Sequence, residues 1–534
     1  MNPSPAPLYA AGSVGARRVR RTAALRLLMV LPAVVLLAAS AAMAAETPTP
    51  PAPDTPVLKH SDVAFMYAAT PEAYTAYGAT FVAWGGAETA EKVKMHHDLG
   101  IRCTGSMWCL TAGAKALYED EKLRDAVAKD IEGKPIAVPW LFDHTYKDMK
   151  TYFGCTNHPV FRAYSEKKVR EAMAGGADGL HVDDHLGVAQ PATAFGGGLC
   201  DYCVAAFREY LKKQATPEQL AKAGVADLEK FDYRELIRKH AATRDEYMKV
   251  RRRIPLMDLF DRFHLEAAAE FVGHLRDVGA QAAGHPILLS ANAWLVEERH
   301  RYVAKYLTHV VCEAEFRAEK GTADLGRVLP DFEQGRALGK PVVVTGSGWD
   351  FACVKANKAE DLVRFWIALT YAHGQWFMVP HPKKQWCFTS QLGTHWYEAP
   401  VEAYAPLYQF IRKNAEWFDG FEAADVGVLT VPPKVLCVAR RKSGNWPIVL
   451  HVINRDYDAE AKRMRPMKNV SIMGLSTLGG RARLLSYDAE PQELKTWTEG
   501  GATEIKLPEL RLWSLVVIEN APGSPRRVFD KLGG

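Results

Sequence analysis

The feature that most constrains this fold is an alternation of strand-like and helix-like segments between residues 80 and 380. Short aliphatic, β-branched or aromatic runs are separated by longer amphipathic stretches, several of which end at glycine. A series of strands separated by helices over about 300 residues favours an α/β fold of the (β/α)8 barrel type. The eight predicted strands are Thr80–Trp84, Ile101–Gly105, Ile136–Trp140, Gly179–Asp183, Ile287–Asn292, His309–Glu315, Pro341–Thr345 and Gln375–Val379.

An open doubly wound sheet is the alternative to a barrel. That fold requires a glycine-rich phosphate loop after an early strand, and Gly85-Gly86 is too short to supply one. We therefore predict a barrel over residues 61–420.

Two segments depart from the alternation. The stretch Cys200–Gly284, between the fourth and fifth strands, is rich in charged and helix-forming residues, so we expect a helical insertion beside the barrel mouth. After Gly420, short strand-like runs are separated by Gly, Asp, Asn and Pro. This spacing predicts a small antiparallel β-sandwich over residues 421–520, with no chemistry of its own, followed by a tail over 521–534.

The N-terminus has the pattern of a secretory signal peptide. An arginine cluster precedes the apolar run Leu27–Ala39, and Ala42-Met43-Ala44 supplies a cleavage site of small residues. The run is shorter than the roughly 20 residues that a membrane anchor needs. We expect a signal peptide over residues 1–44, a proline-rich linker over 45–60, and a secreted or periplasmic protein.

The net charge of +5 comes from the same segment. Residues 1–44 contain five arginines and no Lys, Asp or Glu, so the remainder carries 5 − 5 = 0. The charge therefore gives no support for a nucleic-acid partner or for binding to an anionic membrane.

Acidic residues lie at the ends of two predicted strands. The fourth strand ends in Asp183-Asp184, and the sixth contains Glu313 and Glu315 on one face. Active sites of barrels lie at the carboxyl ends of the strands, and buried glutamates are costly unless they face a polar cavity. The alternatives are that the aspartates cap the next segment and that an arginine such as Arg102 or Arg317 neutralises the glutamates.

Aromatic and polar residues recur at the other strand ends. Aromatic faces pack against sugar rings, and adjacent polar groups bind hydroxyls, so the pattern favours a carbohydrate ligand. The candidate substrate-binding residues are Trp84, Trp140, Asp143, His144, His181, Asn292, Trp294, Trp349 and His381.

The segment Leu180-His181-Val182-Asp183, preceded by Asn157-His158-Pro159 and a helix, is similar to the nucleophile strand of the dextranase family and, more distantly, of α-galactosidases. This resemblance implies a glycoside hydrolase with Asp183 as the nucleophile and a strand-six glutamate as the acid/base. Asp184 is the alternative nucleophile. The doubled aspartate and the insertion depart from dextranases, so the resemblance does not supply the sugar.

Of the two glutamates, we expect Glu315 to be the acid/base because it lies closer to the strand end, and Glu313 to be the alternative. We expect retention of the anomeric configuration on an oligo- or polysaccharide substrate.

Two other functional classes remain open. One is a non-catalytic carbohydrate-binding barrel, which would not need both acids to face one cavity. The other is a metal-dependent barrel hydrolase that uses His181, Asp183, Asp184 and His185. Adjacent residues of a strand point to opposite faces, so at most His181 and Asp183 could share an ion.

Nine cysteines occur, all after the predicted signal peptide, and an odd number leaves at least one unpaired within the chain. Cys200-Asp-Tyr-Cys203 has the spacing of half a zinc site, which Cys155 or a histidine would complete. A disulfide or two free thiols fit the spacing equally well. From the sequence we therefore assign no metal ligand and no cofactor.

Overall fold

The computed structural model describes residues 57–519, apart from 108–109, 327, 443–446, 476–477 and 479. The predicted signal peptide, most of the predicted linker and the whole of the predicted tail lie outside the described residues. None of the described helices is long and apolar enough to cross a membrane.

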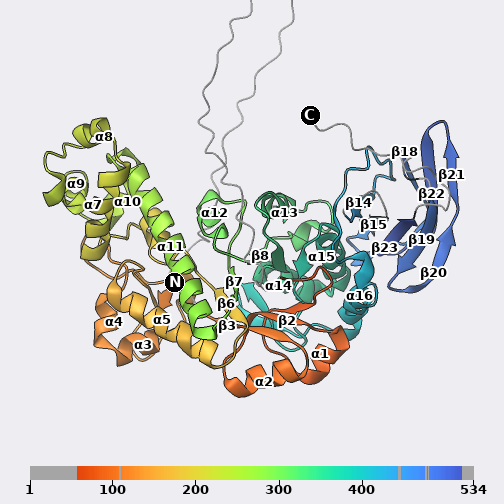
Figure 1. The fold of residues 1–534 in the computed structure, drawn as a ribbon, viewed down its shortest axis with the longest axis horizontal. Coiled ribbons are helices and arrows are strands. Elements are labelled where there is room, and N and C mark those ends of the chain that lie inside the picture. Colours follow the sequence, from red (N-terminus) through yellow and green to blue (C-terminus); the bar gives the residue numbers. More distant parts are fainter. Residues whose placement is uncertain are drawn as a thin grey trace, which may run out of the picture. The chain divides into compact units, whose positions relative to one another are not determined.

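Parallel strands form the centre of the fold, and helices lie around them (Figure 1). A five-stranded sheet has the order β1-β2-β3-β6-β7, and a three-stranded sheet has the order β10-β9-β8. Isolated parallel bridges join Asn292 to Val311 and Phe65 to Val379, which connects the two sheets at both of their edges. The strands are β1 Ala64–Phe65, β2 Phe81–Gly86, β3 Arg102–Ser106, β6 Gly179–Val182, β7 Leu288–Ala291, β8 Val310–Ala314, β9 Val342–Gly346 and β10 Trp376–Phe377.

Most of these strands are followed by a helix, and several of the helices begin at a recognisable capping signal. Thr70 accepts the backbone N–H of Ala73, with Pro71 in the first turn, and Ser347 and Asp350 form a capping box. The helices are α1 Pro71–Tyr77, α2 Ala90–Asp98, α5 Pro159–Ala174, α11 Met257–Ala283, α12 Glu298–Ala304, α13 Val328–Ala337, α14 Gly348–Asn357, α15 Glu360–Ala372 and α16 Val401–Lys413.

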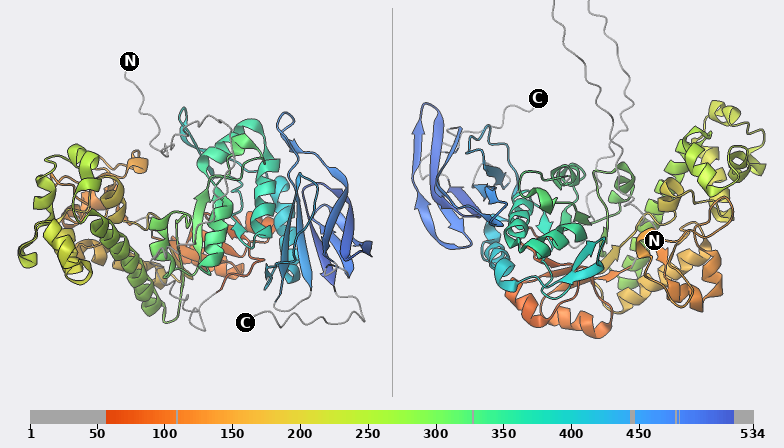
Figure 2. Two further views of the ribbon diagram at one scale, coloured as in Figure 1. Left: turned by 90° about the horizontal axis from the view of Figure 1, so that it is seen from above. Right: turned by 180° about the vertical axis from the view of Figure 1, so that it is seen from behind.

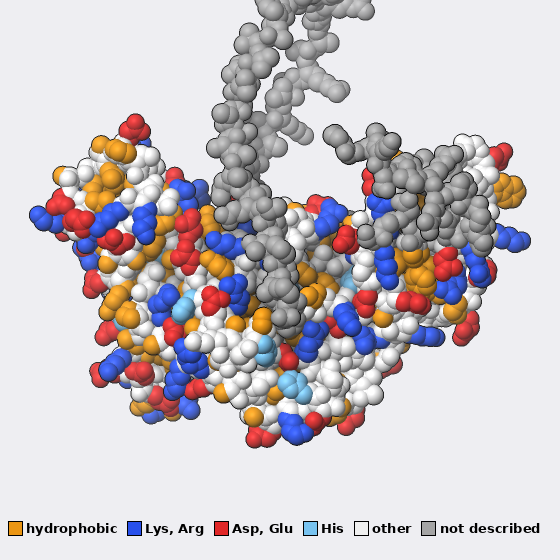
Figure 3. All heavy atoms as spheres, viewed as in Figure 1, with side chains coloured by type: hydrophobic (Ala, Val, Ile, Leu, Met, Phe, Trp, Pro, Cys, Tyr) orange, Lys and Arg blue, Asp and Glu red, His pale blue; other side chains and the backbone are white. Residues whose placement is uncertain are grey.

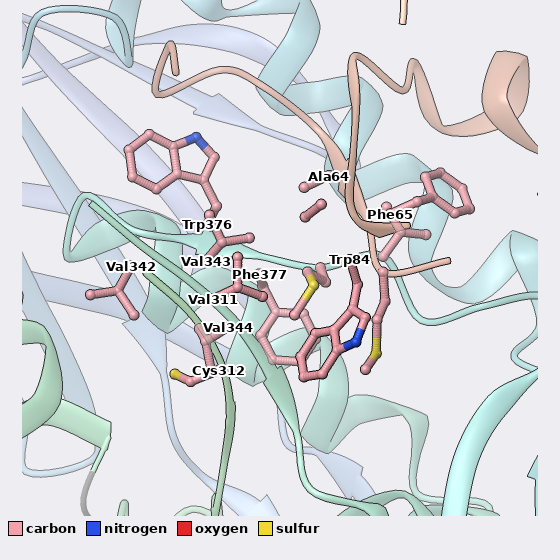
Figure 4. Packing of buried hydrophobic residues seen from close by; sticks show 14 of the residues in the cluster. Ala64, Phe65, Trp84, Val311, Cys312, Val342, Val343, Val344, Trp376 and Phe377 are labelled. Carbon is pink, nitrogen blue, oxygen red and sulfur yellow. The ribbon is translucent and has the colours of Figure 1, made fainter. Parts of the chain in front are cut away.

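The core is continuous between the strands and the helices. The side chains of Val311, Val343, Val344 and Phe377 are fully buried, as expected of strands covered on both faces. Figure 4 shows these side chains in one buried cluster that also includes Trp84. The strands are thus held largely by apolar packing, although buried polar side chains also occur within them, among them Thr104, His181 and Ser290.

Two strand predictions need correction. Residues Ile136–Trp140 do not join the parallel sheets; they form antiparallel contacts with residues 128 and 151–153 and end in a 3₁₀ turn, Pro139–Leu141. The first parallel strand is instead β1, which was not predicted because it spans only two residues. One predicted strand is thus removed from the parallel strands and one unpredicted strand is added before it. The order is otherwise unchanged, so the aspartates still follow the fourth parallel strand and Glu313 still lies on the sixth.

A loop segment, residues 107–158, separates β3 from α5. It contains β4 Thr111–Ala112, β5 Tyr152–Phe153, α3 Ala114–Glu119 and α4 Glu121–Asp125. The stretch predicted as a helical insertion follows β6 and is helical (yellow to green in Figure 1). It contains α7 Asp201–Gln214, α8 Pro217–Lys222, α9 Tyr233–Arg238, α10 Arg244–Val250 and all of α11, and a short helix, α6 Ala189–Ala194, precedes it.

The C-terminal region is antiparallel, as predicted (Figure 2). One sheet has the order β13-β14-β15-β23-β19-β20 and a second has β18-β22-β21, and buried residues of both sheets share one hydrophobic cluster. The strands are β13 Glu422–Ala423, β14 Val435–Arg441, β15 Ile448–Asn454, β18 Met467–Leu475, β19 Arg481–Ser486, β20 Ala489–Leu494, β21 Thr496–Glu499, β22 Ala502–Leu510 and β23 Trp513–Glu519. Two hairpins, β11 Gln385–Thr389 with β12 Gly393–Tyr397 and β16 Tyr457–Asp458 with β17 Arg463–Met464, complete the strands.

Candidate active site

Asp183 and Asp184 lie directly after β6, and hydrogen bonds orient Asp183. Its Oδ1 accepts the Nδ2–H of Asn292 at 3.0 Å and the backbone N–H of Asp184 at 2.9 Å. Asp184 has φ 46°, a left-handed conformation that is uncommon for a residue with a side chain. Such strained positions often occur where a side chain must point in a defined direction.

Glu313 is the penultimate residue of β8, and Glu315 lies beyond the end of the strand. The indole Nε1–H of Trp294 donates to the backbone oxygen of Glu313 at 2.7 Å, which fixes the main chain there. The side chain of Glu313 is half-buried, whereas that of Glu315 is exposed. The two glutamates therefore have different surroundings although both lie at the end of one strand.

Burial and a nearby negative charge change the acidity of Glu313. Burial, followed by the charge of Asp184, raises the pKa of the Glu313 carboxyl from 4.5 to about 7. A carboxyl with this pKa is neutral over most of the acidic range and still exchanges its proton near neutrality. This is the acidity that a proton donor needs.

The three carboxyls influence one another. Burial, then the charge of Asp184 and that of Glu313, raises the pKa of Asp183 well above its usual value, and the hydrogen bond from Asn292 opposes this rise. Like charges raise each other's pKa in this way only when they are close. The acids of β6 and β8 thus lie close to one another.

Tyr67 is a further residue of this site that the sequence analysis missed. It follows β1, and burial, then the charges of Glu313 and Asp183, raises the pKa of its hydroxyl, so the phenol stays protonated and can donate a hydrogen bond. The apolar run Val63–Tyr67 is the signal that would have identified this strand end.

His181 and Trp84 lie beneath the acids. Their rings are 4.3 Å apart, and Nδ1 of His181 is 2.9 Å from the hydroxyl of Ser290. Burial lowers the pKa of His181 well below its usual value, so the ring is neutral. Among the described residues, the groups of three possible metal ligands are Cys155, Cys200 and Cys203, and His97, Cys103 and Asp178.

The remaining candidates divide into two groups. Trp140 reaches the acids: its Nε1–H donates to Oδ2 of Asp184 at 3.2 Å, and its side chain is partly exposed. Trp349 is about half exposed on α14, with its ring against that of Phe388.

The others have mainly local contacts. Asp143 and His144 lie on the surface and contact each other at 2.8 Å. His381 is buried, with Nδ1 accepting the backbone N–H groups of Lys383 and Lys384, so it holds its own loop rather than facing solvent.

The charged side chains form no single-sign field on the face drawn in Figure 3, where acidic and basic groups are interspersed. This agrees with the near-zero charge of the chain after the N-terminal segment. A neutral ligand such as a glycan needs no such field.

No family model matches the chain. A curated relative, the alpha-agarase of Thalassotalea agarivorans, is 24% identical over 275 residues, which are 50% of this chain and 18% of the relative. The chain thus covers less than a fifth of that relative's length.

Among solved structures, a cycloisomaltooligosaccharide glucanotransferase of Paenibacillus sp. has a TM-score of 0.54 and 11% identity, with 85% of this chain and 84% of that chain covered. An Anoxybacillus α-amylase has a TM-score of 0.46 and 10% identity over 85% and 89% of the two chains. The first of these likenesses shows that this chain shares the fold of the glucanotransferase. Neither match bears on the dextranase family in particular.

Proposed function

We propose that this protein is a glycoside hydrolase with a closed (β/α)8 barrel and a carboxylate pair at the barrel mouth. The observation that carries the proposal is the convergence of Asp183 and Asp184 with Glu313, whose pKa is raised to about 7. Two carboxyls with different acidities, one neutral and one ionised near neutral pH, are what glycosidic bond cleavage requires. The similarity to an alpha-agarase and the fold shared with a glucanotransferase support it.

In this proposal Glu313 is the general acid/base and Asp183 is the nucleophile. Two hydrogen-bond donors reach Oδ1 of Asp183 and favour its charged form, whereas the pKa of Glu313 is shifted only by burial and by the charge of Asp184. In this proposal the proton shared among the three acids lies on Glu313, and its presence there reduces the repulsion that Asp183 experiences. Asp184, held by Trp140, is the alternative nucleophile.

This assignment replaces Glu315, which the sequence favoured as the acid/base. Glu315 lies after the end of β8 and is exposed. Burial raises the pKa of Glu313 and suits it to donate a proton, and the exposed Glu315 is not buried in this way.

The substrate class and the place of action are also proposals. Agarose is the first substrate to test because the curated relative is an alpha-agarase. The partly exposed Trp140 beside Asp184 offers a ring face for a sugar. The arginine-rich N-terminal segment followed by an apolar run supports export to the periplasm or beyond, where a polysaccharide is accessible.

The test is release of reducing ends from agarose and from α-glucans by the purified chain. We expect Asp183→Asn to lower turnover by several orders of magnitude with little change in melting temperature. Asp125→Asn, at a largely exposed surface position, is the matched control and should behave as wild type. Activity of Asp183→Asn within about tenfold of wild type, a barrier change of roughly 1.4 kcal/mol, would contradict the assignment.

The stereochemical outcome follows from the same experiment. NMR of the first product identifies its anomer. Retention is expected if the carboxyls of Asp183 and Glu313 lie about 5–5.5 Å apart with substrate bound, and inversion is expected if their separation is about 6.5–9.5 Å. Binding of glycans without any product would instead favour the non-catalytic barrel.

A further inference from the structure

Three cysteines from two separate segments of the chain converge in the interior. Cys155 lies just after β5, and Cys200 and Cys203 lie at the start of α7. Sγ of Cys155 is 3.3 Å from Sγ of Cys200 and 3.4 Å from Sγ of Cys203, and all three sulfurs lie within 4.8 Å of one another. The three side chains are 0%, 6% and 0% exposed. Cys155, one of the residues that the sequence offered to complete the site, therefore lies next to the C-x-x-C pair.

A disulfide does not account for this arrangement. A disulfide joins two sulfurs at about 2.05 Å and would leave the third buried thiol beside it without a role. In a tetrahedral zinc site with Zn–S bonds of about 2.3 Å, neighbouring sulfurs are about 3.8 Å apart. The observed sulfur–sulfur separations are closer to those of a zinc site than to a disulfide bond, and a zinc site uses all three sulfurs.

Hydrogen-bond donors reach all three sulfurs. Nδ2 of Asn157 donates to Sγ of Cys203 at 3.4 Å, and the backbone N–H groups of Cys203 and Asn157 donate to Cys200 and Cys155. The N-terminal end of α7 adds the positive end of a helix dipole. Donors of this kind around the sulfurs are the usual outer layer of a metal–thiolate site.

A histidine is available beside the cluster. His264, on α11, is fully buried next to Cys200, and neither of its ring nitrogens makes a hydrogen bond of normal length. A buried imidazole without such bonds is costly unless a further ligand satisfies it. However, His264 is not in the group of possible ligand atoms that lie within 4.8 Å of one another, so the three cysteines alone define the site.

We propose that Cys155, Cys200 and Cys203 bind one structural zinc ion, with a nitrogen or oxygen donor in the fourth position. The ion would join the loop segment 107–158 to the helical insertion that begins at α7. The cysteines lie in a small hydrophobic cluster with Phe153, whose ring is 5.6 Å from that of Trp140. The site would thus hold the segment that carries Trp140, and it does not depend on the proposed hydrolase activity.

The first test is the metal content of the full chain, purified without a metal-chelating resin and measured by inductively coupled plasma mass spectrometry. We expect about one zinc per chain. Cys155→Ser should lose the zinc, whereas Cys387→Ser, at a buried cysteine on β11 outside the cluster, should keep it.

The second test uses the wild-type protein and does not require that a variant folds. X-ray absorption at the zinc edge should show three sulfurs at about 2.3 Å and one nitrogen or oxygen at about 2.0–2.1 Å. Zinc bound without sulfur would overturn the proposal. The proposal would also be overturned by a protein that is purified without metal and whose melting temperature does not rise when zinc is added. In that case the three cysteines would be found as free thiols, or two of them would form a disulfide.

Discussion

Glu313 and Glu315 differ in their surroundings although only one residue separates them. Glu313 is half-buried with its backbone held by Trp294, and Glu315 is exposed beyond the strand. Acid/base catalysis depends on a proton that is bound near the operating pH, so only Glu313 has the environment for it.

We predict that Glu313→Ala loses about 10²–10⁴-fold in turnover on natural glycans and much less on an activated aryl glycoside, whose leaving group needs little protonation. Glu315→Ala should stay within about tenfold of wild type on both, a barrier change of roughly 1.4 kcal/mol or less. Steady-state kinetics on the two substrates measure the difference. The opposite pattern would return the role to Glu315.

The raised pKa of Glu313 also predicts a dependence of stability on pH. The folded protein holds this proton up to about pH 7, whereas the unfolded chain releases it near 4.5, so the free energy of unfolding falls as the pH rises between these values. Glu313→Gln has no carboxyl to ionise, so its free energy of unfolding should not fall for this reason as the pH rises. We expect the variant to be more stable than wild type by roughly 1–3 kcal/mol at pH 8 and nearly equal at pH 4.

Thermal unfolding at both pH values measures this effect, with Glu315→Gln as the exposed control. An equal difference between Glu313→Gln and wild type at pH 4 and pH 8 would show that the carboxyl is not perturbed in the folded protein.

At the scale of elements, close contact between β6 and β7 positions the aspartates. A Cβ at Gly179 would lie 2.3 Å from the backbone oxygen of Leu288 and 2.5 Å from its Cβ. Only glycine permits this approach at the start of the strand that ends at Asp183.

We predict that Gly179→Ala lowers the free energy of unfolding by at least about 1–3 kcal/mol, because the backbone of β7 must move. Gly85→Ala is the matched control: Gly85 is also a strand glycine, and a Cβ there meets no atom within 4 Å. It should be neutral or slightly stabilising. Denaturant titration measures both, and equal effects at the two positions would contradict the packing argument.

At the scale of the whole molecule, the C-terminal sheets and the helices around the parallel strands share a core. The ring of Trp513, on β23, is 1% exposed and lies 5.5 Å from that of Phe410 on α16 and 5.9 Å from that of Phe418. This contact is expected to make the two regions unfold together.

Trp513→Ala should cost about 3–5 kcal/mol and lower the melting temperature in a single transition. Trp497→Ala, at a side chain that is 70% exposed on β21, should change the stability by less than about 0.5 kcal/mol. Differential scanning calorimetry distinguishes the outcomes. Two separate transitions, with only one shifted by Trp513→Ala, would show that the regions unfold independently.

By itself, the sequence determined the alternation of strands and helices, the antiparallel C-terminal region and the position of acids at the ends of two strands. These features are local: a buried parallel strand is a continuous apolar run, and a helix ends at glycine, so each is visible within about ten residues. The run Val63–Tyr67 is apolar but shorter than the other strand runs, and only two of its residues form β1. Ile136–Trp140 has the apolar pattern of a strand but pairs outside the parallel sheets.

Only the tertiary structure decided which residues act together. The choice between Glu313 and Glu315 depends on burial and on the charge of Asp184, which comes from a different strand. The convergence of Cys155 with Cys200 and Cys203 depends on how a loop and an inserted helix pack across a separation of 45 residues. Burial and charge–charge distance are properties of the packed chain, and spacing along the sequence does not contain them.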